Sequence, residues 1–521
     1  MKMGKVGLIG YGVYLPPFKV RVKEVVKGRV KKDNEQRAER AERGLGLLYK
    51  GMTGPGEDTI TMATEAVKRA LKMAELPPSE IGSSFDKKGT LCVGTESKVY
   101  DVLTDAKHVK AFLGMGPMVL EADMESACDA GLKAVSLAWD AVRAGSARYG
   151  IGVGVDIALG PPGDDLEFAC GAGGVALVIG EGDLVASIEH ITPHSELARD
   201  FLRPAGRPFP LHFGPVTKRS YLYSVVNCLA LHMEEGNLSW DEVDHFVTHQ
   251  PNFYLPGRKL PRILAGGDKE FTLEDLLNPN YFDDVSEVKE RLRISMEEYE
   301  EKTKYSFVVS ETGNVYAAST CTGLARILDN ANPGEKVLAV SFGSGHSSTA
   351  ATFSVEDGID KRRRVEGVEE LMKRMKEVNF KTYDNWFTSR IRRIFRPDMR
   401  FVAEHVDPLG EDKVSVEICP ECDLLFYPPK PHPLLYECLC DVPKEVVNIP
   451  SRAEVEVRKL SKRERFSLLR NPKRMMRRLY EEGNVPVVEA GEGFRGEVKV
   501  TVRRIYRDGG LIVYAPVYRP V

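Results

Sequence analysis

Apolar and polar positions form two recurring patterns over the first 395 residues. Short runs that are apolar throughout, such as 6–15, 90–94, 148–155 and 175–180, predict buried strands. Between such runs apolar residues recur at helical spacing, most clearly over 60–73, which predicts helices with one buried face. This alternation predicts an α/β fold with helices layered on buried strands.

The same pattern continues without obvious sequence identity in the second half of this region. Strands are expected over 185–191, 243–252 and 335–345, and a helix over 220–235. An acidic, polar segment over 266–305 predicts a surface excursion that contains a helix near 285–302.

After Pro397 the pattern changes to cysteine pairs, prolines and β-like runs, so we place a domain boundary near residue 396. A helix rich in Arg and Lys is expected over 461–482. The predicted domains are 1–180, 181–396 and 397–521.

Composition narrows the functional classes. A net charge of -3 with 29% charged residues gives a mixed-sign surface with no global attraction to nucleic acid. No apolar run reaches the roughly 18 residues that a membrane span needs. Nine mostly scattered cysteines fit a reducing cytoplasm better than a disulfide framework.

Four residues together indicate one class of reaction. Cys128 lies where a loop of small residues becomes a helix, and the positive end of that helix is expected to favour its thiolate. Glu96, His249 and Asn314 also lie at predicted strand ends or helix starts, where α/β sheets gather functional residues. A nucleophilic thiol, a carboxylate base, an imidazole and an amide suit acyl transfer from a thioester.

Each of these residues also has a simpler interpretation. Cys128 could be a core cysteine, Glu96 a helix cap, His249 a hydrogen-bonding residue at a strand end, and Asn314 a turn residue.

Several motifs occur together, in one order, over residues 1 to about 395. In these motifs the chain resembles archaeal hydroxymethylglutaryl-CoA synthases of the thiolase superfamily. The motifs are Gly56-Glu57-Asp58-Thr59, Gly94-Thr95-Glu96-Ser97, Glu125-Ser126-Ala127-Cys128, Gly173-Gly174, His249-Gln250-Pro251-Asn252, Gly313-Asn314-Val315-Tyr316-Ala317-Ala318-Ser319 and Phe342-Gly343-Ser344-Gly345.

The resemblance implies two stacked α/β halves in a duplicated, thiolase-like αβαβα fold, a homodimer or higher oligomer, and condensation of acetyl-CoA with acetoacetyl-CoA without a catalytic cofactor. It implies that Cys128 carries the acetyl group, that Glu96 is the acid and base, and that His249 hydrogen-bonds the acetoacetyl carbonyl. Asn314 and Ser344 match substrate-orienting positions, and His212 matches a histidine of the loop beside the active site.

The chain differs from the usual family sequence at two segments that concern substrate binding. Phe213-Gly214-Pro215-Val216 replaces the usual Gly-Gly-Arg-Phe, and Phe253-Tyr254 replaces Gly-Lys after the histidine motif. A basic contact to coenzyme A is therefore missing or is supplied by Arg258 or Lys259.

Residues 397–521 resemble an archaeal family that joins a zinc ribbon to a small OB-fold barrel and associates with thiolase and this synthase. Cys419, Cys422, Cys438 and Cys440 would hold a structural zinc. The second pair has one intervening residue where two are usual, so one ligand is absent or His432 substitutes. The resemblance favours contact with coenzyme A or an acetoacetyl-CoA thiolase over nucleic acid.

Two other functions stay open. A ketoacyl synthase of the third type shares a Cys/His/Asn set, but decarboxylating a malonyl unit needs no base such as Glu96. A non-catalytic scaffold that binds coenzyme A thioesters and tethers a thiolase would not be acylated at Cys128.

Overall fold

The computed structural model describes residues 5–363, 366–391, 400–429, 438, 440, 442–508 and 511–521. The chain divides into two compact units. The first unit comprises residues 1–52 and 62–383, and the second comprises residues 53–61 and 384–521. The boundary predicted near residue 396 lies outside the described residues.

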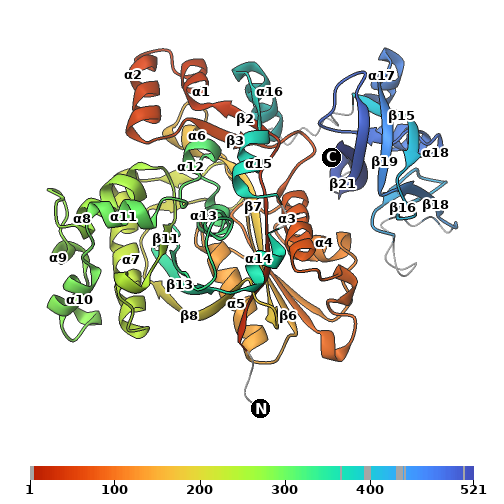
Figure 1. Ribbon diagram of the computed structural model, residues 1–521. Coiled ribbons are helices and arrows are strands. Elements are labelled where there is room, and N and C mark those ends of the chain that lie inside the picture. The colour runs from red at the N-terminus through yellow and green to blue at the C-terminus, as the bar shows by residue number, and fades with distance from the viewer. Residues whose placement is uncertain are drawn as a thin grey trace. The chain divides into compact units, whose positions relative to one another are not determined.

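A nine-stranded sheet runs through the first unit in the order β11-β12-β13-β8-β1-β7-β6-β4-β5 (Figure 1). Only the pairs Gly7–Ser187 and Leu8–Ala186 join β1 to β8, so the sheet has two halves with a narrow connection. The strands are β1 (Val6–Tyr14), β4 (Gly89–Gly94), β5 (Val119–Met124), β6 (Tyr149–Ile157), β7 (Ala172–Glu181), β8 (Ala186–Ser195), β11 (His245–Thr248), β12 (Lys336–Val340) and β13 (Ser347–Val355).

Successive side chains of these strands enter different cores, as the pleat of a strand requires. On β12, Val337 packs in a central core and Leu338 packs in a core with α7 (Gly214–Glu235). On β7, Leu177 enters the central core and Val178 a third core with α3 (Thr59–Met73) and α4 (Asp105–Phe112). Both faces of each half are buried, which explains why the strands are apolar throughout.

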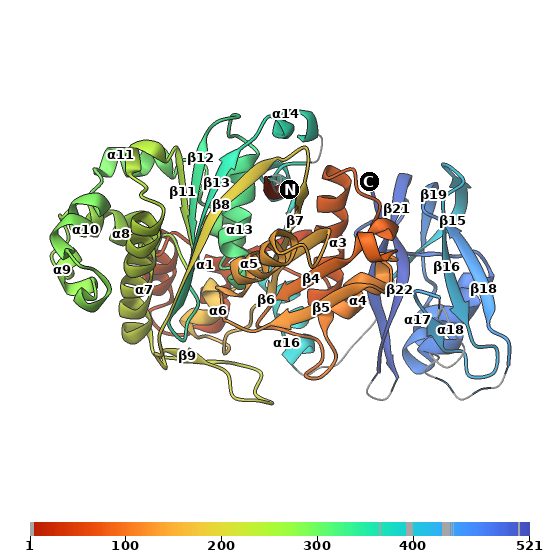
Figure 2. The same cartoon turned by 90° about the horizontal axis from the view of Figure 1, so that it is seen from below.

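The central core also contains the apolar sides of α5 (Ala130–Arg143) and α13 (Ser319–Leu328). These two helices lie between the halves of the sheet, while α3 and α4 cover one outer face and α7 covers the other (Figure 2). The layers therefore alternate helix, sheet, helix, sheet, helix, and the mixed α/β prediction is confirmed.

Smaller elements of the first unit surround these layers. A three-stranded sheet pairs β14 (Lys376–Val378), β2 (Phe18–Arg21) and β3 (Tyr49–Met52), next in sequence to α1 (Val22–Arg29) and α2 (Asn34–Glu39). A two-stranded hairpin joins β9 (Phe201–Leu202) to β10 (Leu211–His212).

The helix predicted near 285–302 is two helices, α10 (Val285–Leu292) and α11 (Met296–Lys302). Ser295 accepts a hydrogen bond from the backbone N–H of Glu298, and the Glu298 side chain accepts one from the N–H of Ser295. This capping box starts a new helix within a segment whose charge and periodicity predict a single helix.

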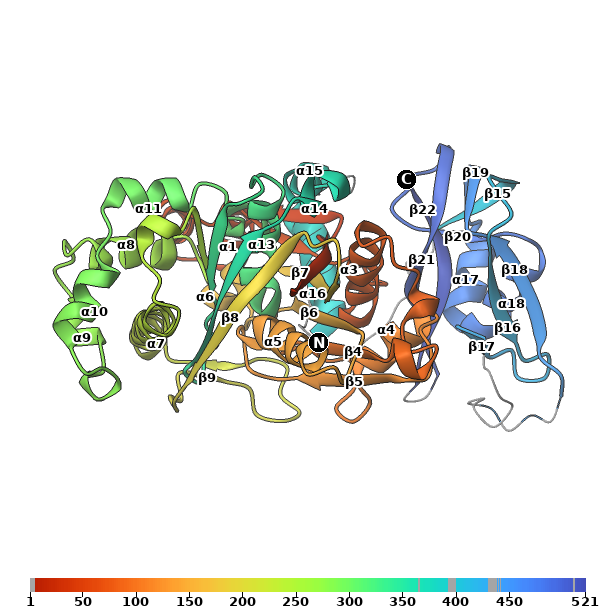
Figure 3. The ribbon, with the colours of Figure 1, turned by 60° about the horizontal axis from the view of Figure 1, so that its bottom comes forward.

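The second unit contains a closed barrel in the order β15-β19-β21-β22-β20 and a three-stranded sheet in the order β17-β16-β18 (Figure 3). Both share one apolar core. The barrel strands are β15 (Phe401–Pro408), β19 (Arg452–Lys459), β20 (Pro486–Val487), β21 (Arg495–Asp508) and β22 (Leu511–Pro520), and the sheet strands are β16 (Lys413–Ile418), β17 (Leu425–Phe426) and β18 (Glu445–Pro450).

The helix predicted over 461–482 is also two helices, α17 (Lys462–Arg470) and α18 (Pro472–Glu481). Asn471 caps the second helix through its side chain, and Pro472 occupies the first turn, where a missing N–H costs nothing. Among the described residues, no helix combines the length and the apolar character that crossing a membrane requires.

Candidate active site

Cys128 lies in the turn between β5 and α5, and its side chain is buried. The preceding residue, Ala127, has a φ of 46°, a left-handed conformation that is rare for residues with a side chain. The sulfur packs in a small apolar cluster with Cys170 and Tyr316, and Phe201 lies against this cluster. The prediction of a thiol at a loop-to-helix junction therefore agrees with its observed place.

The Cys128 thiol donates a hydrogen bond to Glu96 Oε1 over 3.4 Å. Burial and, to a lesser degree, the negative charge of Asp156 together raise the pKa of Glu96 to about 8. Burial also raises the pKa of the Cys128 thiol well above its usual value, as do the carboxylates of Glu96 and Asp156. The expectation that the helix dipole would favour a thiolate is not met, because burial and two carboxylates disfavour the negative sulfur.

Asp156, at the end of β6, organises the turn that carries Glu96. Its buried Oδ1 accepts hydrogen bonds from Thr95 Oγ1 at 3.0 Å, Glu96 N at 2.8 Å and Ser97 Oγ at 2.5 Å. Its Oδ2 accepts one from Ala317 N at 2.9 Å. Burial raises the pKa of Asp156 to about 6, while these hydrogen bonds oppose the rise. One carboxylate thus ties the Glu96 turn to the segment that follows Asn314.

Asn314 lies beside Cys170, and its backbone pairs with the chain on both sides of that residue. Asn314 N donates to Ala169 O at 2.8 Å, and Gly171 N donates to Asn314 O at 2.7 Å. The side-chain Oδ1 accepts from Tyr316 N at 2.9 Å, so Asn314 also has the turn role that was its simpler interpretation. The Tyr316 hydroxyl lies 3.2 Å from the sulfur of Cys170.

His249 follows β11 and is 1% exposed. Burial lowers its pKa to about 3, so the imidazole is neutral at physiological pH. Its ring lies 6.2 Å from the ring of Phe342 and 6.5 Å from that of Tyr221, whose hydroxyl donates to His249 O at 2.9 Å. Its Nδ1 has no hydrogen-bond partner among the described residues, which leaves this buried nitrogen for a ligand.

His212 lies on the exposed β9–β10 hairpin. Its ring is 6.1 Å from that of Phe201, which is in turn 6.1 Å from the ring of Tyr316. From the same hairpin, the guanidinium of Arg203 donates to the backbone carbonyl of Glu96. The hairpin therefore contacts the Cys128 cluster and the Glu96 turn, which are predicted to hold the reacting groups.

Ser344 lies in the turn between β12 and β13, next to Gly345 with a φ of 91° and His346 with a φ of 77°. A Cβ atom built on the preceding Gly343 would lie 2.3 Å from Ser126 O. Only glycine allows this approach, which places the turn that carries Ser344 against the turn that carries Cys128.

The two basic residues expected near coenzyme A already have protein partners. Arg258 donates to the carbonyl oxygens of Arg43 and Gly44 at 2.8 and 3.3 Å. Lys259 is 5% exposed and its Nζ pairs with Asp268 at 2.7 Å and with Glu270 at 3.0 Å. Their predicted role in binding coenzyme A would require these contacts to change.

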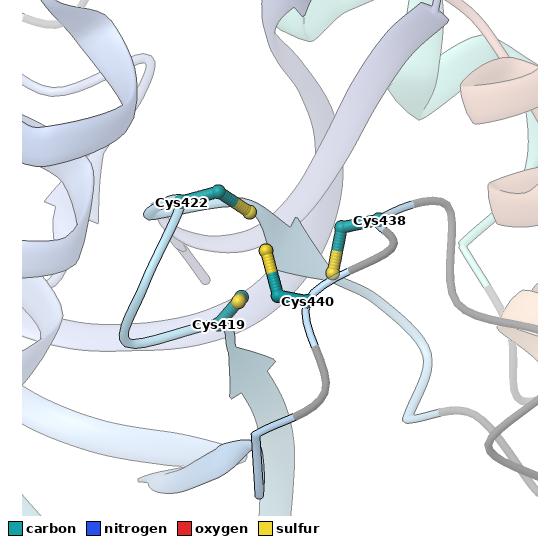
Figure 4. A group of neighbouring side chains, drawn as sticks. All are labelled: Cys419, Cys422, Cys438 and Cys440. Carbon is teal, nitrogen blue, oxygen red and sulfur yellow. The ribbon is translucent and has the colours of Figure 1, made fainter.

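In the second unit, Cys419, Cys422, Cys438 and Cys440 form a group whose sulfur atoms all lie within 4.8 Å of one another. The four side chains point toward a common centre (Figure 4). Tetrahedral zinc with four thiolates has sulfurs about 3.8 Å apart, so the group fits that ion after a small contraction. The tight spacing of the second pair does not exclude either cysteine, and His432 lies outside the described residues.

Sequence reasoning missed Asp156 and the contact between Cys170 and Tyr316. Asp156 directly follows the apolar run 148–155 in the sequence, a signal of the kind that selected Glu96, and could have been found that way. Nothing near Cys170 in the sequence indicates that it meets Tyr316, 146 residues away.

The family described as "Hydroxymethylglutaryl-coenzyme A synthase C terminal" matches residues 263–395. The chain is 33% identical to the hydroxymethylglutaryl-CoA synthase of Methanosphaera stadtmanae over 381 residues, which are 72% of this chain and 96% of that protein. It is 35% identical to that of Methanothermobacter thermautotrophicus over 382 residues, again 72% of this chain and 96% of that protein.

Among solved structures, "MvaS in complex with 3-hydroxy-3-methylglutaryl coenzyme A" superposes with a TM-score of 0.62 at 24% identity. The match covers 74% of this chain and 92% of that one. A second structure, of "HMG_CoA synthase complexed with CoA", superposes with a TM-score of 0.58 at 18% identity over 78% of this chain and 95% of that one. These likenesses show the fold.

Proposed function

The chain belongs to the hydroxymethylglutaryl-CoA synthase family, and on that basis we propose that it condenses acetyl-CoA with acetoacetyl-CoA through an acetyl group carried on Cys128. The contact that supports this most directly is the 3.4 Å hydrogen bond from the Cys128 thiol to Glu96. It joins a nucleophile to a base that can take its proton.

In the first step the Cys128 sulfur attacks the carbonyl of acetyl-CoA. A new sulfur–carbon bond forms, the bond to coenzyme A breaks, and the thiol proton passes through Glu96 to the departing coenzyme A sulfur. Because the thiolate is disfavoured in its buried setting, proton transfer accompanies attack instead of preceding it.

In the second step Glu96 removes a proton from the methyl group of acetyl-Cys128. A carboxylate with a pKa of about 8 is a stronger base than an ordinary glutamate, which favours deprotonation of a weak carbon acid. The resulting carbanion attacks the ketone of acetoacetyl-CoA, and Glu96 returns the proton to the new alkoxide. Water then cleaves the bond to Cys128 and releases the product.

His249 and Asn314 are proposed to polarise and orient the acetoacetyl ketone. Neutral His249 can donate one hydrogen bond to a carbonyl and has a buried nitrogen without a partner among the described residues. The Asn314 side-chain oxygen is bonded to Tyr316 N, which leaves its amide N–H₂ to act as the donor.

Substrate binding is proposed for His212, Ser344, Arg258 and Lys259. The contact of Phe201 with both His212 and the Cys128 cluster supports the first, and the close approach of Gly343 to Ser126 supports the second. The two basic residues stay predictions, because their side chains are engaged by the protein.

For the second unit we propose a zinc ribbon followed by an OB-fold. The four converging thiols support a Cys₄ site, and Lys444, whose ammonium donates to the carbonyls of Cys440 and Val442 at 2.9 and 3.0 Å, places a positive charge beside it. Bound zinc would join distant segments of a small sheet and stabilise it. The closed five-stranded barrel supports the OB-fold.

The localisation, the oligomeric state and the binding partners are proposals as well. We propose that the enzyme is a cytoplasmic homodimer or higher oligomer, that it forms a complex with an acetoacetyl-CoA thiolase, and that the second unit contacts coenzyme A or this partner instead of nucleic acid. No metal is required for the chemistry at Cys128.

Intact-mass spectrometry after brief exposure to acetyl-CoA tests the proposal. Wild-type protein should gain one acetyl group, Cys128→Ala should gain none, and acetoacetyl-CoA should discharge the adduct. A persistent adduct would show that the acceptor is wrong and would reopen the ketoacyl synthase of the third type. Folded protein without an adduct would exclude the enzyme and favour the acyl-CoA-binding scaffold.

A further inference from the structure

The residue that follows Cys128 is a fully buried carboxylate whose two hydroxyl partners come from the other half of the fold. Asp129 Oδ1 accepts a hydrogen bond from the Ser341 hydroxyl, and Oδ2 accepts one from the Thr349 hydroxyl at 3.2 Å. Lys133 Nζ, one helical turn further along α5, lies 3.2 Å from Oδ2. These three groups balance the charge of Asp129 inside the protein.

Hydrogen bonds also hold the turn that carries Cys128 on the side that precedes the cysteine. Lys133 Nζ donates to Ser126 Oγ at 2.8 Å, and Ser126 Oγ lies 3.3 Å from Ser347 Oγ. We call Ser126, Asp129, Lys133, Ser341, Ser347 and Thr349 the nucleophile clamp. Four hydroxyl groups, one carboxylate and one ammonium thereby connect Ser126 and Asp129, on either side of the nucleophile, to β13 and to the residue that follows β12.

The clamp also holds the turn that carries Ser344. Ser341 N donates to Thr349 O at 2.8 Å, and Thr349 N donates to Ser341 Oγ at 3.2 Å, so the two hydroxyl-bearing residues close the base of that turn. Gly343 packs on Ser126 and Asp129 so closely that a Cβ atom there would lie 2.9 Å from Asp129 N. The nucleophile turn and the Ser344 turn therefore form one rigid body.

We propose that Asp129 is a positioning residue that sets the place of the Cys128 sulfur for acyl transfer. The reason is mechanical: Ala127 has a left-handed backbone, a strained conformation that persists only where the surrounding structure imposes it. Asp129 supplies charge-assisted hydrogen bonds directly after the cysteine. A shift of the backbone at this position would move the sulfur relative to Glu96. This inference rests on the proposed acetylation of Cys128.

The test measures the rate of acetylation of full-length protein by acetyl-CoA, with quenched-flow sampling and intact-mass detection. Asp129→Asn keeps the size of the side chain but loses the charge, and it should lower the limiting acetylation rate about 10- to 100-fold. The acetyl-CoA concentration for half-maximal rate should change less than about threefold, because the clamp holds the nucleophile and not the substrate. Thr349→Val, a milder change, removes one hydroxyl donor and should lower the rate about three- to tenfold.

Asp329→Asn is the matched control. Asp329 is a partly buried carboxylate in the first unit, and it accepts from Tyr11 Oη at 2.8 Å and Val368 N at 2.7 Å, outside the clamp and the proposed site. It should lower the thermal midpoint while leaving the acetylation rate of folded protein within twofold of wild type. A purely structural role for Asp129 would give this same result.

A double-mutant cycle of Asp129→Asn with Ser341→Ala supplies a second readout. The two effects on the acetylation rate should not add, since Ser341→Ala removes the bond to Asp129 that Asp129→Asn weakens by removing the charge. Wild-type rates in folded Asp129→Asn and Thr349→Val would overturn the positioning role while the acetyl-enzyme stands. Lack of acetylation in wild type would instead overturn the proposed function itself.

Discussion

Cys128 lies in an apolar pocket beside two carboxylates, whereas Cys419, Cys422, Cys438 and Cys440 lie beside one another and near the ammonium of Lys444. The first setting favours the protonated thiol, which donates a hydrogen bond to Glu96. The second gathers four sulfurs within 4.8 Å of one another, close enough to hold a tetrahedral metal after a small contraction. Burial and neighbouring charges, not the cysteine itself, separate a proposed nucleophile from proposed ligands.

Removing the Cys128 thiol would test this contrast most directly. Cys128→Ala should lower the condensation rate at least about 10⁴-fold, because no other group can carry the acetyl group. Thiol release from acetyl-CoA in the presence of acetoacetyl-CoA measures it. Cys321→Ala, which removes another buried thiol of the first unit, should leave the rate within twofold. A similar loss in both variants would contradict the special role of Cys128.

Removing the metal should act on the second unit. A tight chelator, or Cys419→Ser, should release close to one zinc per chain and lower the free energy of unfolding of this unit by about 5 kcal/mol. Elemental analysis and protection of the β16 and β18 amides from hydrogen exchange measure the two effects. Cys92→Ser, in β4, should retain the metal. Metal-free wild type with fully protected amides would contradict the zinc ribbon.

The pH dependence tests the carboxylate beside Cys128. A base acts in its deprotonated form, and the pKa of Glu96 is raised to about 8, so the condensation rate should rise with pH and level off above about 8. Glu96→Gln should lower the rate about 10²- to 10⁴-fold and remove this rise. Asp105→Asn, at another buried carboxylate, should keep the wild-type profile. A profile that levels off near pH 5 would mean that Glu96 is an ordinary carboxylate.

The smallest expected effect is on stability. The pKa of Glu96 in the folded protein lies above its unfolded value of 4.5. The stability that Glu96 contributes is therefore fully present below about pH 4.5 and is lost as the pH rises through about 8. Glu96→Gln should therefore exceed wild type in free energy of unfolding at pH 9 by on the order of 2 kcal/mol. Denaturant midpoints at pH 5 and pH 9 measure this difference. Equal midpoints at both pH values would contradict the raised pKa.

The sequence predicted several residues of the candidate site because they have local signals. A cysteine before an apolar helix, and polar residues directly after apolar strands, selected Cys128, Glu96 and His249. The apolar runs also predicted the buried strands and hence the layered α/β fold. Helix ends were less well predicted, because Ser295 and Asn471 start new helices through side-chain caps that barely interrupt the charge pattern.

Residue types and spacing alone thus determined which chain segments are strands and helices, where a thiol meets a helix, and that four cysteines could share a metal. Only the tertiary structure decided that the Cys128 thiol is disfavoured as an anion, that Asp156 holds the Glu96 turn, and that Asp129 meets Ser341 and Thr349. Periodicity reports on neighbours a few residues apart. The partners of Asp129 are 212 and 220 residues away, and they meet it only because the two halves of the sheet pack on the same pair of helices.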